Sequence, residues 1–279
     1  MNRNIFLGIL VFFLAFSAHS QQPEEQYSDE NDFQIVSLDD GSSVMIIGYE
    51  GGSQNIRIPP EILEMPVSSI ADGAFEGKDL VSVSIPDSVT SIGESAFAEN
   101  QIRSLSIPGS LTVIESGAFM DNQISSLSIP HGVTIIGEGA FANNRLGALV
   151  IPDSVTDIGD GAFGYNNLTS LSLSSGMTII GNSSFIDNHL TALTIPEGVT
   201  AIDSMAFAFN RLTSVVIPAS MSSIGLGAFL GNQINSITIG SNVSLNRDSF
   251  ENNFSSFYVN NGSRAGTYTR TGSNWSFRR

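Results

Sequence analysis

Few side chains in this sequence have the type and spacing that catalysis or metal binding requires. Downstream of residue 20 the only histidines are His131 and His189, which stand at different positions of a repeating pattern. General acid–base catalysis and metal coordination need groups that converge on one point. Two isolated histidines do not meet this requirement, so we interpret both as solvated surface residues.

Carboxylates recur along the chain but do not form a catalytic pair. Glu94, Glu138 and Asp160 occupy one repeating position. Other repeats carry at this position Ser116, Asn182, Ser204 and Leu226. The sequence has no Ser-His-Asp arrangement, nucleophile elbow, lysine-containing phosphate loop or EF-hand spacing. It therefore predicts a protein that is not an enzyme, with no catalytic residue, no cofactor and no metal.

The charge of the chain narrows the choice of partners. Eleven Lys and Arg stand against 27 Asp and Glu, which gives a formal net charge of -16. Phosphate backbones and anionic membrane surfaces attract basic proteins, so we expect no nucleic-acid partner. The chain has no cysteine, which excludes disulfides and thiolate chemistry.

The N-terminus has the pattern of a secretory signal peptide. Arg3 precedes the apolar run Ile5–Phe16, and Ala18 and Ser20 provide the small residues of a cleavage site. We expect residues 1–20 to be removed on export; an uncleaved N-terminal anchor is the alternative. No second long apolar run follows, so we expect no transmembrane segment after cleavage and a location outside the cytoplasm.

A phenylalanine that recurs every 22 residues, with a last interval of 21, defines the architecture. The series is Phe75, Phe97, Phe119, Phe141, Phe163, Phe185, Phe207, Phe229 and Phe250. A fixed period of this length is typical of a solenoid in which each repeat forms one coil. We expect these side chains to fill the interior of the coils.

Each repeat also contains the pattern L-x-x-L-x-L, as in Leu80, Val83 and Ile85. Its alternating end predicts one short strand per coil, and stacked coils predict a continuous parallel sheet with strands about 4.8 Å apart. The outward positions, which we call the hydroxyl face, are mostly small: Ser82, Ser84, Ser104, Ser106, Ser126, Ser128, Ser170, Ser172, Thr194, Ser214, Ser236 and Thr238, with Ala148, Val150, Ala192 and Val216 between them. Small residues here either allow like positions of neighbouring coils to stack without crowding or repulsion, or form a flat surface that recognises a protein or glycan.

An asparagine stands three residues after each Phe from the second repeat onward: Asn100, Asn122, Asn144, Asn166, Asn188, Asn210, Asn232 and Asn253. An amide side chain can donate and accept at once, so a stacked column of Asn can satisfy the buried backbone of a bend. A second column holds Gly93, Gly137, Gly159, Gly181 and Gly225, which we expect to adopt backbone angles that other residues resist.

The L-x-x-L-x-L pattern is joined here to "IPxSVTxIGxxAFxxN". This combination resembles the BspA-like leucine-rich repeat, also called the Treponema pallidum type, of bacterial surface proteins. The unit is one residue shorter than the family's commonest unit, and Asn stands where the family often has Cys. The resemblance implies a leucine-rich-repeat solenoid, with a parallel β-sheet on one face, short turns or 3-10 segments on the other, and little α-helix. It carries over no ligand.

The repeats need caps because their first and last coils would otherwise expose core. We predict a disordered acidic leader at 21–32, an N-terminal β cap at 33–57, the solenoid at 58–253 and a C-terminal β cap at 254–279.

Two variable columns, two and four residues after each Phe, indicate a binding edge. Core columns must repeat, so variation here predicts residues that the fold does not dictate. Aromatic and basic residues, which dominate interface energies, gather there as Arg145, Tyr165, His189, Phe209 and Arg211. In the alternative, Tyr165 and Phe209 fold back over the edge of the core.

The sequence therefore predicts a secreted, periplasmic or cell-surface bacterial protein that binds or adheres to a protein ligand. The ligand would come from a host, a matrix or another bacterial surface. The alternatives are a structural envelope component without a specific ligand and, less favoured, a β-solenoid enzyme acting on polysaccharides. Ice binding is a further alternative, weakened by the valines within the hydroxyl face.

Overall fold

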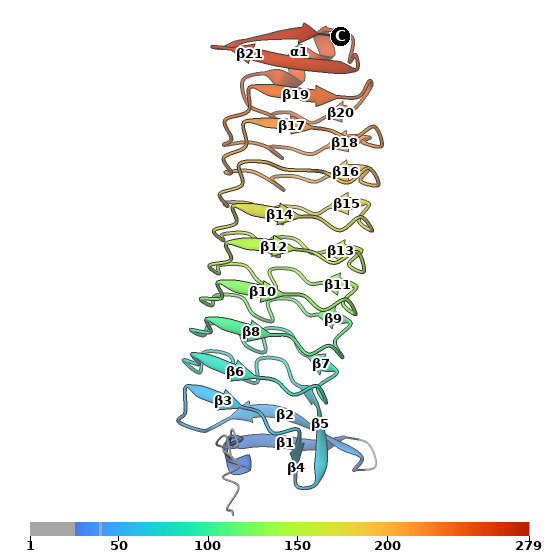
Figure 1. Cartoon of the computed structure of the whole chain (residues 1–279). Coiled ribbons are helices and arrows are strands. Elements are labelled where there is room, and N and C mark those ends of the chain that lie inside the picture. Colours follow the sequence, from blue (N-terminus) through green and yellow to red (C-terminus); the bar gives the residue numbers. More distant parts are fainter. Residues whose placement is uncertain (1–25, 39–40, 279) are drawn as a thin grey trace, which may run out of the picture.

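The computed structural model describes residues 26–38 and 41–278. The predicted signal peptide lies outside these residues. The chain forms a stack of coils, and one face carries a column of short strands (Figure 1). These are β3 (Asn55–Arg57), β6 (Ser82–Ser84), β8 (Ser104–Ser106), β10 (Ser126–Ser128), β12 (Ala148–Val150), β14 (Ser170–Ser172), β17 (Ser214–Val216) and β19 (Ser236–Ile239). This is the predicted leucine-rich-repeat solenoid.

A second column of strands runs along the solenoid, where the sequence predicts turns and short 3-10 segments. It comprises β5 (Met65–Ile70), β7 (Ser91–Ile92), β9 (Val113–Ile114), β11 (Ile135–Ile136), β13 (Asp157–Ile158), β15 (Ile179–Ile180), β16 (Ala201–Ile202), β18 (Ser223–Ile224) and β20 (Ser244–Leu245). Within the described residues the only 3-10 helix is η1 (Glu30–Asp32). The pairs are parallel and in register, with Ile136 opposite Ile114 and Ile158.

The hydroxyl face is less regular than the predicted continuous sheet. Its strands pair in twos: β3 with β6, β8 with β10, β12 with β14, and β17 with β19. Residues 192–194, between β14 and β17, form no strand. The hydrogen-bonded ladder is therefore interrupted on this face.

The repeating phenylalanines form a continuous stack through the interior. Centroids of successive rings from Phe75 to Phe250 lie 4.8–5.7 Å apart, and the planes of neighbouring rings differ by 16° or less. Every ring in the series is at most 2% exposed. Offset stacking at this distance is favourable for aromatic pairs, so the stack links each coil to its neighbours.

The predicted role of the repeating glycines is wrong. Gly137, Gly159 and Gly225 are not among the residues with positive φ. A Cβ added at Gly159 would instead lie 2.4 Å from the Glu138 backbone nitrogen of the preceding coil, and the distances at the other two are similar. Glycine is required here because neighbouring backbones approach closely.

The N-terminal end is closed by a hairpin of β1 (Phe33–Leu38) and β2 (Ser43–Tyr49), which are antiparallel. β2 continues into the second strand column by pairing with β5, and β4 (Glu61–Ile62) pairs antiparallel with β5. The rings of Phe33 and Tyr49 lie 6.3 and 5.8 Å from Phe75 and end the aromatic stack. Part of the predicted disordered leader is ordered, since residues 30–32 form η1.

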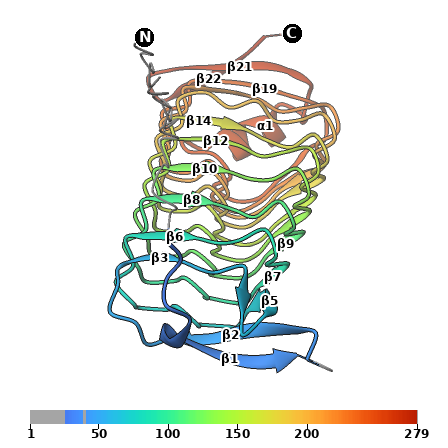
Figure 2. The ribbon, with the colours of Figure 1, turned by 60° about the horizontal axis from the view of Figure 1, so that its bottom comes forward.

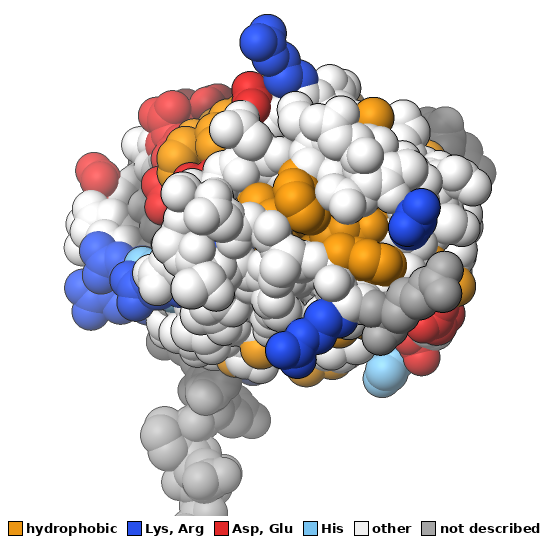
Figure 3. Space-filling view, turned by 90° about the horizontal axis from the view of Figure 1, so that it is seen from above, with side chains coloured by type: hydrophobic (Ala, Val, Ile, Leu, Met, Phe, Trp, Pro, Cys, Tyr) orange, Lys and Arg blue, Asp and Glu red, His pale blue; other side chains and the backbone are white. Residues whose placement is uncertain are grey.

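The C-terminal end differs from the all-β cap that the sequence predicts. It begins with helix α1 (Phe254–Asn260), followed by the hairpin of β21 (Gly266–Thr271) and β22 (Asn274–Arg278). β21 extends the hydroxyl-face sheet by pairing antiparallel with β19, and Phe254 meets Phe250 edge to face at 5.2 Å. Figure 2 shows the two caps at opposite ends of the coils, and Figure 3 looks down on the C-terminal end.

Candidate binding site

The asparagine column forms a ladder of hydrogen bonds that defines the bend beside the variable edge. Asn144 Nδ2 donates to the carbonyls of Phe141 in its own coil, at 3.2 Å, and Phe119 in the preceding coil, at 2.9 Å. Its Oδ1 accepts from the Ile124 N–H at 3.0 Å. Each asparagine therefore completes the bend of the coil before it.

The same contacts recur at Asn100, Asn122, Asn166, Asn188, Asn210 and Asn232. With Asn144, these residues are 2–7% exposed.

The prediction that Asn253 belongs to this column is wrong. Asn253 is exposed, has a left-handed backbone with φ of 57° and makes no side-chain capping hydrogen bond. The last repeat is one residue shorter, and other groups close its bend. Glu251 accepts from the Gly231 N–H at 2.9 Å, and the Trp275 indole N–H donates to the Asn252 carbonyl at 3.1 Å.

The position two residues after each Phe is constrained by the fold, contrary to the sequence interpretation. From Gly77 to Gly231 every residue in this column has a positive φ, between 50° and 74°. The left-handed backbone aims the N–H at the next coil, as in the bonds from Tyr165 to Ile186 (2.8 Å) and Phe209 to Leu230 (2.7 Å). Gly, Asn and Asp tolerate this conformation, whereas a bulky residue in it is an outlier.

Tyr165 and Phe209 are the aromatic residues in this strained column. Tyr165 is 52% exposed and Phe209 is 47% exposed. The Phe209 ring lies over Gly231 of the next coil, where an added Cβ would lie 2.4 Å from its Cδ1. Neither ring is buried in the core, so the alternative in which Tyr165 and Phe209 fold back over the core does not hold for Tyr165. It holds for Phe209 only in that one side of its ring is covered by Gly231.

The other three predicted residues lie two positions further along the same coils. Arg145 and Arg211 are exposed and His189 is half-buried. Their backbone N–H groups each donate to the preceding coil, to Ile124, Leu190 and Leu168 respectively, at 2.9 Å.

The predicted binding residues come from four successive coils, whose phenylalanine rings are 5.5–5.7 Å apart. We call Arg145, Tyr165, His189, Phe209 and Arg211 the edge patch.

The hydroxyl face has two hollows that the sequence did not predict. One, of about 350 Å³, lies between β10 and β12 and is lined by His131 and Val150. The other, of about 260 Å³, lies between residues 193–197 and β17 and is lined by Val216. Both occur where the ladder is interrupted, and the two valines are 68% and 63% exposed. Repeat patterns do not reveal such gaps, because each coil keeps the same sequence signature.

His131 is exposed, as predicted, and adjoins one carboxylate of altered acidity. The pKa of Asp153 lies below its usual range, chiefly because the Ser175 N–H donates to it at 2.9 Å and the Ser175 hydroxyl at 2.8 Å. The charge of His131 lowers this pKa to a smaller extent. Asp153 thus contributes to a turn and does not form a catalytic pair with another carboxylate.

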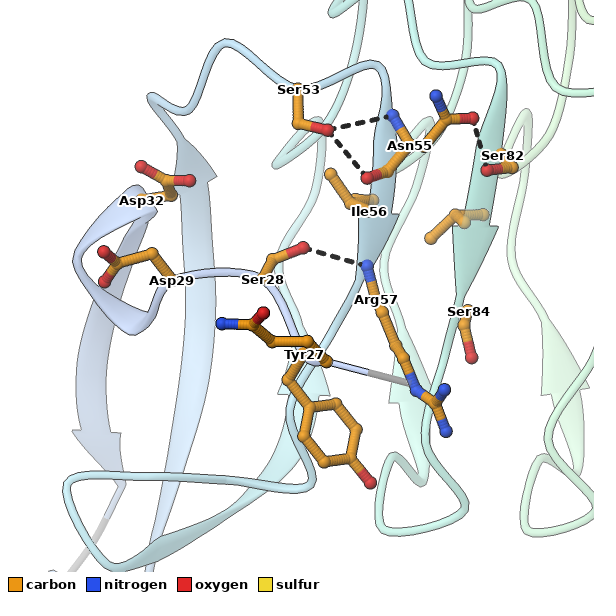
Figure 4. A pocket seen from close by; sticks show the side chains of 12 residues that line it. Tyr27, Ser28, Asp29, Asp32, Ser53, Asn55, Ile56, Arg57, Ser82 and Ser84 are labelled. Atoms are coloured by element: carbon orange, nitrogen blue, oxygen red, sulfur yellow. Dashed lines mark hydrogen bonds between the residues drawn. The ribbon is translucent and has the colours of Figure 1, made fainter. Parts of the chain in front are cut away.

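A third hollow, of about 540 Å³, lies where the N-terminal segment crosses β3 and β6 (Figure 4). The Arg57 guanidinium lies 4.9 Å from the centre of the Tyr27 ring, and the Arg57 backbone N–H donates to Ser28 Oγ at 3.0 Å. The sequence assigned Tyr27 and Ser28 to the leader, because nothing local indicates that they pack on a strand from another repeat.

Two kinds of feature, a metal-binding cluster and a membrane-spanning helix, do not occur in the described part of the chain. No cluster of three or more His, Cys, Asp or Glu side chains that could hold a metal ion occurs among residues 26–38 and 41–278. In the same residues no helix has the length and apolar character needed to cross a bilayer.

The stacked coils, buried phenylalanines and asparagine ladder define a leucine-rich-repeat solenoid. The chain belongs to the family of the BspA type leucine rich repeat region, whose model matches residues 54–165 and 136–256.

Solved structures of leucine-rich-repeat proteins are similar to this chain, and the first of them supports the fold. A leucine-rich repeat protein from Bacteroides ovatus is 23% identical, with a TM-score of 0.64, over 79% of this chain and 67% of that one. The T. pallidum leucine rich repeat protein is 23% identical, with a TM-score of 0.49, over 74% and 89%. A leucine rich cell surface protein from Faecalibacterium prausnitzii is 23% identical, with a TM-score of 0.45, over 91% and 60%. No curated protein matches the chain.

Proposed function

We propose that this protein is exported to the bacterial surface or surroundings and binds another protein through the edge patch. The observation that carries this proposal is the backbone of Tyr165 and Phe209, with φ of 56° at both. A left-handed conformation costs a residue with a Cβ about 1–2 kcal/mol. About half of each side chain remains in solvent, so burial in the core offsets little of this cost.

Retention of such strain indicates that the exposed rings have a use outside folding. Tyr, Phe and Arg bury large area with directional contacts, and Arg and aromatic residues are enriched at protein interfaces. Arg145 and Arg211 place positive charge beside the two rings on a chain of net charge -16. A protein surface that is acidic, or that has pockets for aromatic rings, matches this combination better than nucleic acid does.

The predicted signal peptide and the membership of a family of bacterial surface proteins support an external location. Adhesion to a host, a matrix or another bacterium is the activity we propose for such a protein. A protein without any specific ligand would not need to hold aromatic side chains in a conformation better suited to glycine.

The test begins with identification of partners retained by the purified chain from matrix and bacterial surface extracts. Binding of a recovered partner is then compared for the wild type and a Tyr165→Gly/Phe209→Gly/Arg211→Ala variant. We expect a loss of at least about 2 kcal/mol in binding free energy, the size of an interface hot spot. Glycine suits the left-handed positions, so this variant should remain folded.

A matched control replaces Val150 and Val216 of the hydroxyl face by Ser and should leave binding unchanged. If the edge variant keeps full affinity while the control loses it, the binding site is the hydroxyl face. If no partner is retained, the edge patch has no protein ligand in the extracts and the structural alternative is favoured.

A further inference from the structure

A solvent-exposed leucine marks the N-terminal end of the solenoid. Leu63 and Glu64 form the two-residue turn between β4 and β5, with φ of 53° and 63°. Turns with two left-handed residues strongly prefer Asn-Gly. Leu63 is nevertheless a bulky apolar residue and is 67% exposed. Leu63 lies at the tip of the β4–β5 hairpin, which projects from the end of the solenoid (Figure 1).

The surroundings of Leu63 are acidic. Glu61 and Glu64 flank it and are exposed, and the Glu30 carboxylate accepts a hydrogen bond from its backbone N–H at 3.2 Å. Residues 26–56 contain no Lys or Arg. The β4–β5 turn therefore presents an apolar side chain beside three carboxylates, and Arg57, the first basic residue after this range, lies against the Tyr27 ring.

The C-terminal end has the complementary character. A hollow of about 390 Å³ lies between the last coil and α1, and its lining includes Leu245, Asn246, Arg247, Ser255 and Val259. Val259 is 58% exposed. Viewed from this end, hydrophobic side chains lie near the centre of the face, and both Lys or Arg and Asp or Glu side chains lie towards its rim (Figure 3).

The charges of this end are opposite in sign to those around Leu63. Residues 254–279 contain no Asp or Glu and include Arg264, Arg270 and Arg278. The nearest carboxylates along the chain are Asp248 and Glu251, and Glu251 already accepts the Gly231 N–H.

The two features lie at opposite ends of one strand column. Leu63 adjoins β5, the first member of the second strand column, and Leu245 belongs to β20, the last. This column follows one side of the solenoid in Figure 1. Displacing one copy along the solenoid axis therefore brings its Leu63 turn towards the C-terminal hollow of another.

We propose that copies of this chain associate head to tail, with Leu63 of one copy seated in the C-terminal hollow of the next. Glu61 and Glu64 then face Arg247, which lines that hollow, and the basic C-terminal segment of residues 254–279. Contacts between two acidic ends or two basic ends are disfavoured by repulsion, so association has one polarity. An apolar projection that fits a hollow elsewhere on the same molecule makes a heterologous contact, which extends into chains unless rotation closes a ring.

The first test measures the mass of the purified protein by sedimentation equilibrium over a range of concentrations. We expect the average mass to rise with concentration and the association to weaken with added salt, which screens the charges. Leu63→Gly should weaken association about tenfold or more, since burying a leucine side chain contributes roughly 1.5–3 kcal/mol. Glycine fits the turn, so the fold should be unchanged or more stable. Ile179→Ser, which removes a half-exposed apolar residue midway along the same column, should leave association unchanged.

The second test exchanges the charges. Glu61→Lys/Glu64→Lys and Arg247→Glu/Arg264→Glu variants should each be monomeric alone, because each then carries like charges at both ends. Mixed together they should associate, because every end again meets its opposite.

Three results would overturn the proposal: a constant monomer mass at all concentrations, association that survives Leu63→Gly, or a mixture of charge variants that stays monomeric. A constant mass together with binding to phosphatidylglycerol vesicles, lost in the Arg247→Glu/Arg264→Glu variant, would assign the basic end to an anionic surface.

Discussion

Replacing Asn144 by alanine tests whether the asparagine ladder holds neighbouring coils together. The substitution removes the closer of two amide donors to the Phe119 carbonyl and the acceptor for the Ile124 N–H. Both partners are fully buried, with 0% of either residue exposed. Water therefore cannot replace the lost amide without opening the contact between two coils.

The expected cost follows from these two groups. The Ile124 N–H has no other hydrogen bond, whereas the Phe119 carbonyl keeps the Asn122 amide at 3.3 Å. A buried polar group left without a partner costs about 1–3 kcal/mol. With a smaller loss at Phe119, Asn144→Ala should lower the free energy of unfolding by about 1–4 kcal/mol. The carbonyls of Phe141 and Ala142 lose weaker contacts at 3.2 Å and add to the upper part of this range.

The assay is urea unfolding followed by circular dichroism, with Asn143→Gly as the matched control. Asn143 is the adjacent asparagine, but it is exposed and has a φ of 54°. Glycine adopts this conformation without strain, so the control should unfold within about 0.5 kcal/mol of the wild type, as surface substitutions generally do. Equal urea midpoints for Asn144→Ala and Asn143→Gly would refute the ladder as a source of stability.

Three further predictions concern the core, the close contacts and the C-terminal cap. Phe141→Ala should cost about 3–5 kcal/mol, and loss of amide-exchange protection should begin in the two adjacent coils; uniform loss along the solenoid would contradict nearest-neighbour coupling. Gly159→Ala should cost about 1–3 kcal/mol through overpacking against the neighbouring backbone and more than Gly109→Ala, where an added Cβ meets open space and φ is not positive; thermal melts of the two variants provide the comparison. Burial raises the pKa of Tyr258 and Tyr268 above the ordinary value of 10.0. The folded cap therefore holds these protons more tightly than the unfolded chain does. The stability of the cap should be complete below pH 10 and fall as the pH rises further. Fluorescence of Trp275, the single tryptophan, should report this alkaline transition before the coils unfold, and simultaneous loss of both would argue against it.

The repeat made the interior of this fold predictable from sequence. The Phe column could be assigned because an interior position shared by all coils admits one solution, and the spacing of 22 residues shows which positions are shared. The same reasoning located the buried Asn column. It failed at Asn253, since a one-residue deletion shifts the last coil out of the common geometry.

Features that depend on contacts between coils were harder to predict from the sequence. The left-handed column was missed because Tyr165 and Phe209 hide the preference that Gly77 and Gly231 share. Helix α1 was missed because its seven residues are few and its Ser, aromatic, Val and Asn side chains are weak helix formers. Packing of Phe254 and Tyr258 against the last coil stabilises it. Interruptions of the hydroxyl-face ladder have no signature within a single repeat.

The asparagine ladder makes each coil depend on the coil that follows it in the sequence. Each coil receives its bend contacts from the asparagine of its successor, so a coil is finished only when the following 22 residues are in place. Loss or gain of whole internal units by recombination would preserve every such contact, because the junctions are interchangeable. The junction at residues 229–252 is the exception, since Glu251 and Trp275 replace the missing amide there. Length in this lineage can therefore change by whole repeats in the middle, whereas the C-terminal cap must be inherited together with the coil that precedes it.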